Sequence, residues 1–198
     1  MQHILIFKTL FMRKLFLLLG AGFLLTAATK AQSYERPVGS EFSIGIEGAL
    51  PMNGWDVGDG HGTKFSEFGI GATIKYAYNF NETLAATFQT GYIYFPGKDL
   101  GGGKVNSGQI PIKAGVRFSM SNFYVEPQFG LSSYNVKAVS TTEDVSGSGS
   151  TTAFTYAIGI GAMASRNFDI GLRYEAMSKD GTQGFLALRL AYSLPFGR

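Results

Sequence analysis

The sequence predicts an all-β protein, an eight-stranded antiparallel up-and-down β-barrel that spans a membrane. Three observations lead to this fold class. Eight segments alternate apolar side chains with small or polar ones, the connections between them alternate in length, and the chain opens on a segment typical of protein export. Only 16% of the residues are charged, whereas a soluble domain averages about 25%.

The first 31 residues are predicted to be a cleaved signal peptide. Met12-Arg13-Lys14 supplies the positive charge, Leu15 to Leu25 forms an apolar core, and the small residues that follow favour cleavage after Ala31. This apolar core is shorter than a spanning helix, which needs about 20 residues. Whether translation starts at Met1 or at Met12 stays open.

The mature chain is predicted to be one domain, with a short periplasmic segment at residues 32–40 and the barrel at residues 41–198. Without the leader, 13 basic residues face 14 acidic ones, so the net charge is −1 and no nucleic acid is expected as a partner. The sequence has no cysteine, which excludes disulfides and cysteine-based metal sites.

The first four predicted strands, residues 42–50, 68–78, 84–94 and 110–118, each carry an apolar face with period two. In chain order these faces carry Phe42, Ile44, Ile46 and Leu50; Phe68, Ile70, Ile74, Tyr76 and Tyr78; Leu84, Phe88, Tyr92 and Tyr94; and Ile110, Ile112, Val116 and Phe118. Glycine, alanine, threonine and charged residues occupy most of the positions between them.

The next three strands, residues 123–132, 154–163 and 168–176, follow the same rule. Their apolar faces carry Phe123, Val125, Phe129 and Leu131; Phe154, Tyr156, Ile158 and Ile160; and Phe168, Ile170, Leu172 and Tyr174. The last strand, Leu186 to Phe196, is longer than an ordinary strand and suits the roughly 9–11 residues of a tilted membrane crossing. We expect it to pair with the first strand and close the barrel.

Long and short connections alternate along the chain. The long ones are Asn53 to Lys64, Pro96 to Ser107, Asn135 to Thr152 and, somewhat shorter, Met177 to Gln183. The short ones are tight turns at Phe80-Asn81-Glu82, Ser121-Asn122 and Ser165-Arg166-Asn167. Short turns on the periplasmic rim and long loops outside are typical of outer-membrane barrels.

Period two alone does not say whether the apolar face meets lipid or a ligand-holding interior, as in a soluble lipocalin-like barrel. The aromatic residues of this face favour lipid, because they gather near the strand ends around an aliphatic band, as interfacial girdles do. Two prolines, Pro111 and Pro127, lie inside predicted strands and cannot donate a ladder hydrogen bond. We therefore expect local β-bulges at both positions.

The opposite face carries charges that we expect to form a network inside the lumen. Its members are Glu47, Lys75, Lys113, Arg117, Glu126, Arg173, Glu175 and Arg189, with Asp169 on the same face. The turns predict that Arg117 lies opposite Glu126 and that Glu175 lies opposite Arg189. A charged pore or proton path is the functional alternative, whereas paired charges that plug a narrow eight-stranded lumen are the structural interpretation.

His61 is the one histidine after the leader and lies near Asp56 and Asp59 in a glycine-rich loop. A metal site or a general base is conceivable there, but a histidine between two glycines is poorly held for either task. We expect an exposed outer loop. No metal, cofactor or catalytic residue is therefore predicted.

With the leader, the eight alternating strands and the asymmetric loops, the chain resembles the small outer-membrane β-barrel family of the OmpA transmembrane-domain and OmpX type. In that family, a last strand that ends in an aromatic residue is the signal for the barrel-assembly machinery. Tyr192, Leu194 and Phe196 resemble this signal, although Gly197 and Arg198 follow the aromatic here. The resemblance implies a bacterial outer-membrane location, contact with outer-membrane lipids and a monomer.

The leading functional hypothesis is a non-enzymatic barrel with a structural role, or with a surface-interaction role through its extracellular loops. An outer-membrane barrel enzyme that modifies lipids is one alternative. A soluble periplasmic ligand-binding barrel is another.

Overall fold

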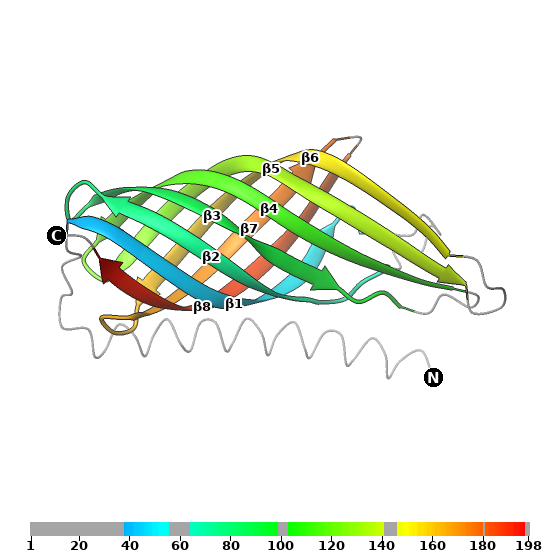
Figure 1. Ribbon diagram of the computed structural model, residues 1–198, viewed down its shortest axis with the longest axis horizontal. Helices are drawn as coiled ribbons and strands as arrows, with labels where there is room; N and C mark the ends of the chain where they lie inside the picture. Colours follow the sequence, from blue (N-terminus) through cyan, green and yellow to red (C-terminus); the bar gives the residue numbers. More distant parts are fainter. Residues whose placement is uncertain (1–37, 56–63, 99–102, 141–145, 180, 197–198) are drawn as a thin grey trace.

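Eight antiparallel strands close into a barrel in which each strand pairs with its neighbours in sequence and β1 pairs with β8 (Figure 1). The computed structural model describes residues 38–55, 64–98, 103–140, 146–179 and 181–196. The strands are β1 Gly39–Asn53, β2 Gly69–Asn79, β3 Leu84–Phe95, β4 Gly103–Met120, β5 Phe123–Ser140, β6 Ser146–Met163, β7 Phe168–Ser178 and β8 Thr182–Phe196. The predicted fold class is confirmed, including the strand number and the closing pair.

The period-two pattern separates the two faces of the wall. In β2, Ile74 and Tyr76 point outward and are exposed, whereas the alternate residues Thr73, Lys75 and Ala77 are buried. An exposed shell of Ile, Leu, Val, Phe and Tyr surrounds a buried interior that holds most of the charged strand residues. This inside-out distribution is the one expected where the wall meets hydrocarbon. In the part of the chain that the structure covers, no helix is long and apolar enough to cross a membrane.

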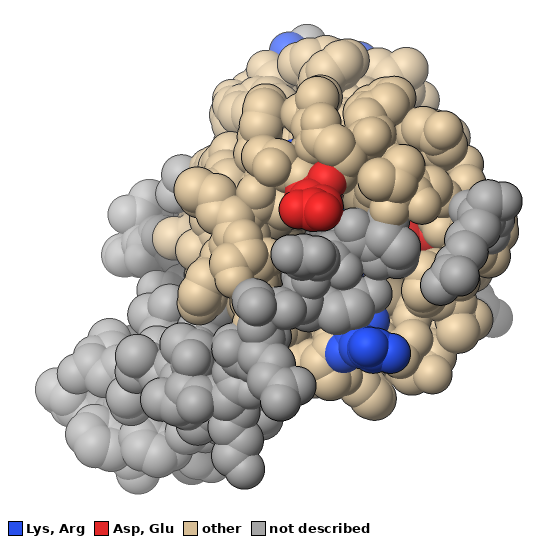
Figure 2. Space-filling view, turned by 90° about the vertical axis from the view of Figure 1, so that its left-hand side faces the viewer, with Lys and Arg blue, Asp and Glu red and all other residues tan. Residues whose placement is uncertain are grey.

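The three short turns lie together at one end, on the left in Figure 1. In the β2–β3 turn, the side-chain oxygen of Asn81 accepts hydrogen bonds from the backbone N–H groups of Thr83 and Leu84, at 2.9 and 2.8 Å. In the β4–β5 turn, Ser121 adopts a positive φ of 57°. Viewed from this end, the described surface carries only a few scattered charges (Figure 2).

Three strands are much longer than the sequence predicts. β4, β5 and β6 have 18 residues each, against 11 in β2 and β7. The β5–β6 ladder continues to the pair Val139–Ser146, so most of the predicted loop from Asn135 to Thr152 is strand, as is the end of the predicted loop from Pro96 to Ser107. The loop boundaries were wrong because the outward apolar face ends before the strands do. In β5, Tyr134 and Val136 of the predicted loop region pack on the inner side, while the backbone pairing continues.

The bulges expected at Pro111 and Pro127 are absent. Around Pro111 the β3–β4 ladder skips two pairs and resumes in the same register, while Pro111 itself pairs with Ser132 of β5. Around Pro127 the β4–β5 ladder has a similar gap, while Pro127 pairs with Ile158 of β6. Each proline lacks a backbone N–H toward only one of its two neighbouring strands. The ladder with that strand is therefore interrupted locally, but its register does not shift. A register shift does occur in the β1–β8 ladder, between Pro51 and Asn53.

Candidate functional site: the barrel lumen

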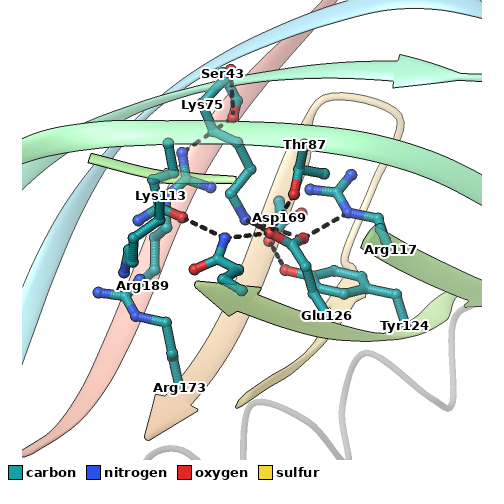
Figure 3. A network of polar contacts seen from close by, with 12 residues as sticks. Ser43, Lys75, Thr87, Lys113, Arg117, Tyr124, Glu126, Asp169, Arg173 and Arg189 are labelled. Carbon is teal, nitrogen blue, oxygen red and sulfur yellow. Dashed lines mark hydrogen bonds and ion pairs between the residues drawn. The ribbon is translucent and has the colours of Figure 1, made fainter. Parts of the chain in front are cut away.

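The half of the lumen nearer the short turns is filled by buried charges, here called the charge layer (Figure 3). It consists of Glu41, Glu47, Lys75, Lys113, Arg117, Glu126, Asp169, Arg173, Glu175 and Arg189. Five are cations and five are anions, so the layer is electrically balanced. Balance matters here because an uncompensated charge in a low-dielectric interior is costly.

Glu126 on β5 is the centre of one half of the charge layer. Its carboxylate accepts hydrogen bonds from Lys75 Nζ at 3.1 Å and from Arg117 Nε at 2.8 Å, with additional bonds from the side chains of Thr87 and Gln128. Arg117 also reaches Glu41 at 3.5 Å and lies over the ring of Tyr124, 4.6 Å from its centroid. Two cations therefore share one carboxylate that is fully engaged by donors.

Arg173 on β7 joins the other two central carboxylates. Its Nη1 and Nη2 donate to the two oxygens of Glu47 at 3.0 and 2.9 Å, and its Nε donates to Glu175 at 2.9 Å. Lys113 forms a short ion pair with Glu175, and Arg189 lies 3.8 Å from Glu47. A guanidinium suits this bridging position because its donors are fixed in a planar fork.

Most of these contacts cross the lumen instead of following the sheet. The pairs Lys75–Glu126, Arg173–Glu47, Arg117–Glu41 and Lys113–Glu175 each join strands that are not neighbours in the barrel. Side-chain amides connect the two halves, since Gln128 donates to Gln89 at 3.1 Å and Gln89 donates to Glu47 at 3.2 Å. The charge layer therefore ties opposite walls of the barrel together.

Small residues make room for the long side chains. An added Cβ at Gly161 of β6 would collide with the ring of Tyr124, whose hydroxyl donates to Asp169 at 2.8 Å. A cavity of about 20 Å³ lies beside Arg173 and Arg189, which is space for about one water molecule. The charge layer is thus close to completely filled.

The other half of the lumen contains a cluster of buried apolar side chains, called the aromatic layer here. It consists of Ala49, Trp55, Ile93, Phe95, Tyr134, Ala153, Met177, Phe185 and Ala187, with Phe65 and Val136 packed against it. Trp55 is fully buried, and its ring centroid lies 4.5 Å from Phe95, 5.0 Å from Phe65 and 6.2 Å from Tyr134. These distances are typical of packed aromatic rings.

The backbone at the end of β1 directs Trp55 into the lumen. Gly54 adopts a left-handed φ of 72°, and a Cβ at this position would collide with the carbonyl of Thr182. The indole N–H then donates to the carbonyl oxygen of Gly184 at 3.1 Å, and the N–H of Phe65 donates to the carbonyl oxygen of Trp55 at 3.0 Å. The indole is therefore satisfied although it is buried.

All eight residues predicted for the lumen network face the interior and are at least 94% buried. The structure brings Arg117 and Glu126 together but does not bring Glu175 and Arg189 together. In the β7–β8 ladder, Glu175 lies opposite Phe185 and Arg189 lies opposite Gly171. The predicted Glu175–Arg189 pair was wrong because Ser178 pairs with Thr182, which places the hairpin two residues earlier than we expected.

The sequence interpretation missed Glu41, the amide bridges of Gln89 and Gln128, and the aromatic layer. A signal for the aromatic layer exists. Residues 92–95 form an unbroken apolar run, as do residues 185–188, so both faces of these strand segments are apolar.

The remaining candidates lie elsewhere. Tyr192, Leu194 and Phe196 are exposed on the outer face of β8. His61, Asp56 and Asp59 lie outside the described residues. Among the residues that the structure does describe, no three His, Asp or Glu side chains are placed to hold a metal ion.

Residues 16–193 match the family described as the outer membrane protein beta-barrel domain. No curated protein matches the chain in sequence.

Solved structures are similar in fold. Ail, the attachment invasion locus protein of Yersinia pestis, aligns with a TM-score of 0.62 and 20% identity over 80% of this chain and 100% of Ail. The N-terminal β-barrel of Pseudomonas aeruginosa OprF aligns with a TM-score of 0.54 and 13% identity over 78% of this chain and 97% of that one. The chain therefore belongs to the outer membrane protein beta-barrel domain family and is a small barrel of the bacterial outer membrane.

Proposed function

We propose that the protein is a non-enzymatic barrel that presents its extracellular strands and loops to a surface partner while paired charges plug its lumen. The observation that carries the first part is the projecting hairpin of β5 and β6 (Figure 1). The β6–β7 ladder ends at Phe154, so within the described part of the chain residues 146–153 pair only with β5, and the other backbone edge of β6 has no partner there.

An unpaired strand edge favours an extended peptide segment of a protein as the partner, because backbone groups on both sides can complete a ladder. Ail of Yersinia pestis has been crystallised with the heparin analogue sucrose octasulfate. The four connections after β1, β3, β5 and β7 carry more acidic than basic residues, with seven Asp and Glu against three Lys, so a sulfated polysaccharide is less suited to this chain.

Photo-crosslinking on intact cells tests the surface role. A photoreactive residue at Ser150, on the exposed part of β6, should form covalent adducts with an extracellular protein, and the same residue at Ser165 in a periplasmic turn should not. A variant in which Asn-Gly replaces residues 137–148 shortens the hairpin between the paired residues Val136 and Gly149. Adducts at Ser150 that survive in this shortened variant, or a complete lack of adducts, would argue against a partner at the hairpin.

Two further measurements test the remaining parts. A plugged lumen predicts that liposomes containing the protein do not swell with small sugars, and sugar flux would contradict the plug. A lipid-modifying activity of the refolded barrel that is lost in His61→Ala would replace the non-enzymatic role with the enzymatic alternative.

We also propose that residues 1–31 are removed on export and that Tyr192, Leu194 and Phe196 guide insertion by the barrel-assembly machinery. N-terminal sequencing of the mature protein should begin at Gln32. Phe196→Ala should lower the amount of folded protein in the outer membrane, and unchanged insertion would contradict that role for Phe196.

A further inference from the structure

We propose that the aromatic layer is a second closure of the lumen, in series with the charge layer, and that Trp55 completes it. The barrel then excludes ions and small polar solutes even when the charge layer is opened. This inference rests in part on the proposed plug, and the experiment below separates the failure of one from the failure of the other.

The strands by themselves do not fill the lumen at this level. β1 and β6 contribute only Ala49 and Ala153 to the aromatic layer, so each of these two strands supplies a single methyl group there. The space that these alanines leave has to be occupied from elsewhere. Trp55 lies in the connection that follows β1 and has the largest fully buried side chain among the described residues. Its indole fills this space.

Aromatic rings from strands that are not neighbours in the barrel pack against the indole of Trp55. Phe95 comes from β3 and Tyr134 from β5, and both pack against Trp55, while Phe185 of β8 packs against Phe95 with centroids 5.5 Å apart. The contacts therefore extend across the lumen instead of lining one side of it. Trp55 is the shared member of the contacts to β3 and β5, so its removal opens the centre of the layer.

The two layers resist solutes for different physical reasons. The charge layer is filled and polar, and an ion that entered it would find charged groups that can replace part of its hydration shell. The aromatic layer offers no such groups at its centre, and a hydrophobic constriction obstructs ions because they would have to shed water without compensation. Loss of the charge layer alone therefore leaves a complete barrier.

Ion conductance across planar bilayers in potassium chloride tests the inference with four proteins. These are the wild type, Trp55→Ala, the double variant Glu47→Ala with Arg173→Ala, and the triple variant that combines all three changes. The double variant removes one anion and one cation, so the charge layer stays balanced. We expect conductance in the triple variant and none above the lipid background in the other three.

Each other outcome has a distinct meaning. Conductance of the double variant equal to that of the triple variant would overturn the second closure and leave the charge plug standing. Conductance of Trp55→Ala alone would overturn the proposed plug. A silent triple variant would overturn the second closure, because removal of both layers should open the lumen.

Folding of every variant is checked by the different gel migration of boiled and unboiled samples. If the triple variant does not fold, Trp55→Leu in place of Trp55→Ala keeps an apolar side chain but leaves part of the space empty, and the same conductance is expected. Met52→Ala added to the double variant is the matched control, because Met52 lies near Trp55 but is 47% exposed on the outside. This control should remain silent.

Discussion

The two halves of the lumen are filled by different kinds of side chain, charged ones in the charge layer and apolar ones in the aromatic layer. The charge layer holds five cations and five anions whose contacts cross between non-adjacent strands. The aromatic layer holds rings and alanines, and its largest member comes from a connection, not from a strand. An eight-stranded barrel is narrow enough for side chains to fill by either route.

The two layers stabilise the barrel in different ways. In the charge layer the removal of one partner leaves opposite charges buried and unpaired. In the aromatic layer the removal of one side chain leaves a cavity. Variants in each layer can therefore be compared by urea unfolding of the refolded barrel in detergent, followed by gel migration of unboiled samples.

Glu126→Ala should have the largest effect. Both Lys75 and Arg117 lose their shared carboxylate, and breaking a buried ion pair costs about 3–5 kcal/mol of the free energy of unfolding. Glu82→Ala, in an exposed turn, is the control and should leave the unfolding midpoint unchanged. A midpoint of Glu126→Ala equal to that of the control would show that the charge layer does not stabilise the barrel.

Trp55→Ala should come next, with a loss of about 3–5 kcal/mol expected for a buried tryptophan that is truncated to alanine. Free indole should restore part of this loss, since it can occupy the cavity and donate to the carbonyl oxygen of Gly184. The same urea titration with and without indole checks this. No response of Trp55→Ala to indole would argue that the layer collapses around the missing ring.

Gly161→Ala should cost about 1–3 kcal/mol, the usual range for overpacking, because the new methyl group meets the ring of Tyr124. Gly159→Ala on the same strand is a matched control, since nothing lies closer than 3.6 Å to a Cβ there. Equal stability of the two variants would mean that Tyr124 does not pack against β6 as described.

Arg117→Lys should have the smallest effect, about 1 kcal/mol. The lysine keeps the charge but cannot reproduce the guanidinium fork between Glu126 and Glu41 or its stacking on Tyr124. Arg166→Lys in an exposed turn is the control. A loss as large as that of Glu126→Ala would indicate that Arg117 carries most of the charge layer's stability.

Particular residues explain how far the sequence could predict this structure. Period two places Lys75, Glu126 and Arg189 inside and Ile74 and Leu190 outside, because alternation in a strand fixes the face of every side chain. It does not fix how far one hairpin slides, which depends on the turn.

Glu175 therefore forms its ion pair with Lys113 across the lumen and not with Arg189 on the neighbouring strand β8. Contacts across a lumen depend on closure of the whole barrel, and no local pattern encodes them. The aromatic layer was hidden for a related reason, because Trp55 follows a strand and Phe95 and Phe185 interrupt the alternation. The length of β4 to β6 was hidden because the outward apolar face of these strands ends at Ile110, Leu131 and Phe154, while the strands continue.

Fluorescence of the protein's single tryptophan tests the two-layer account most directly. With Trp55 fully buried between Phe95 and Tyr134, the refolded barrel should show blue-shifted emission that aqueous acrylamide quenches weakly. Brominated lipids should also quench it weakly, because the ring lies inside the wall. Red-shifted emission with strong acrylamide quenching would show an open, hydrated outer lumen and would contradict the account.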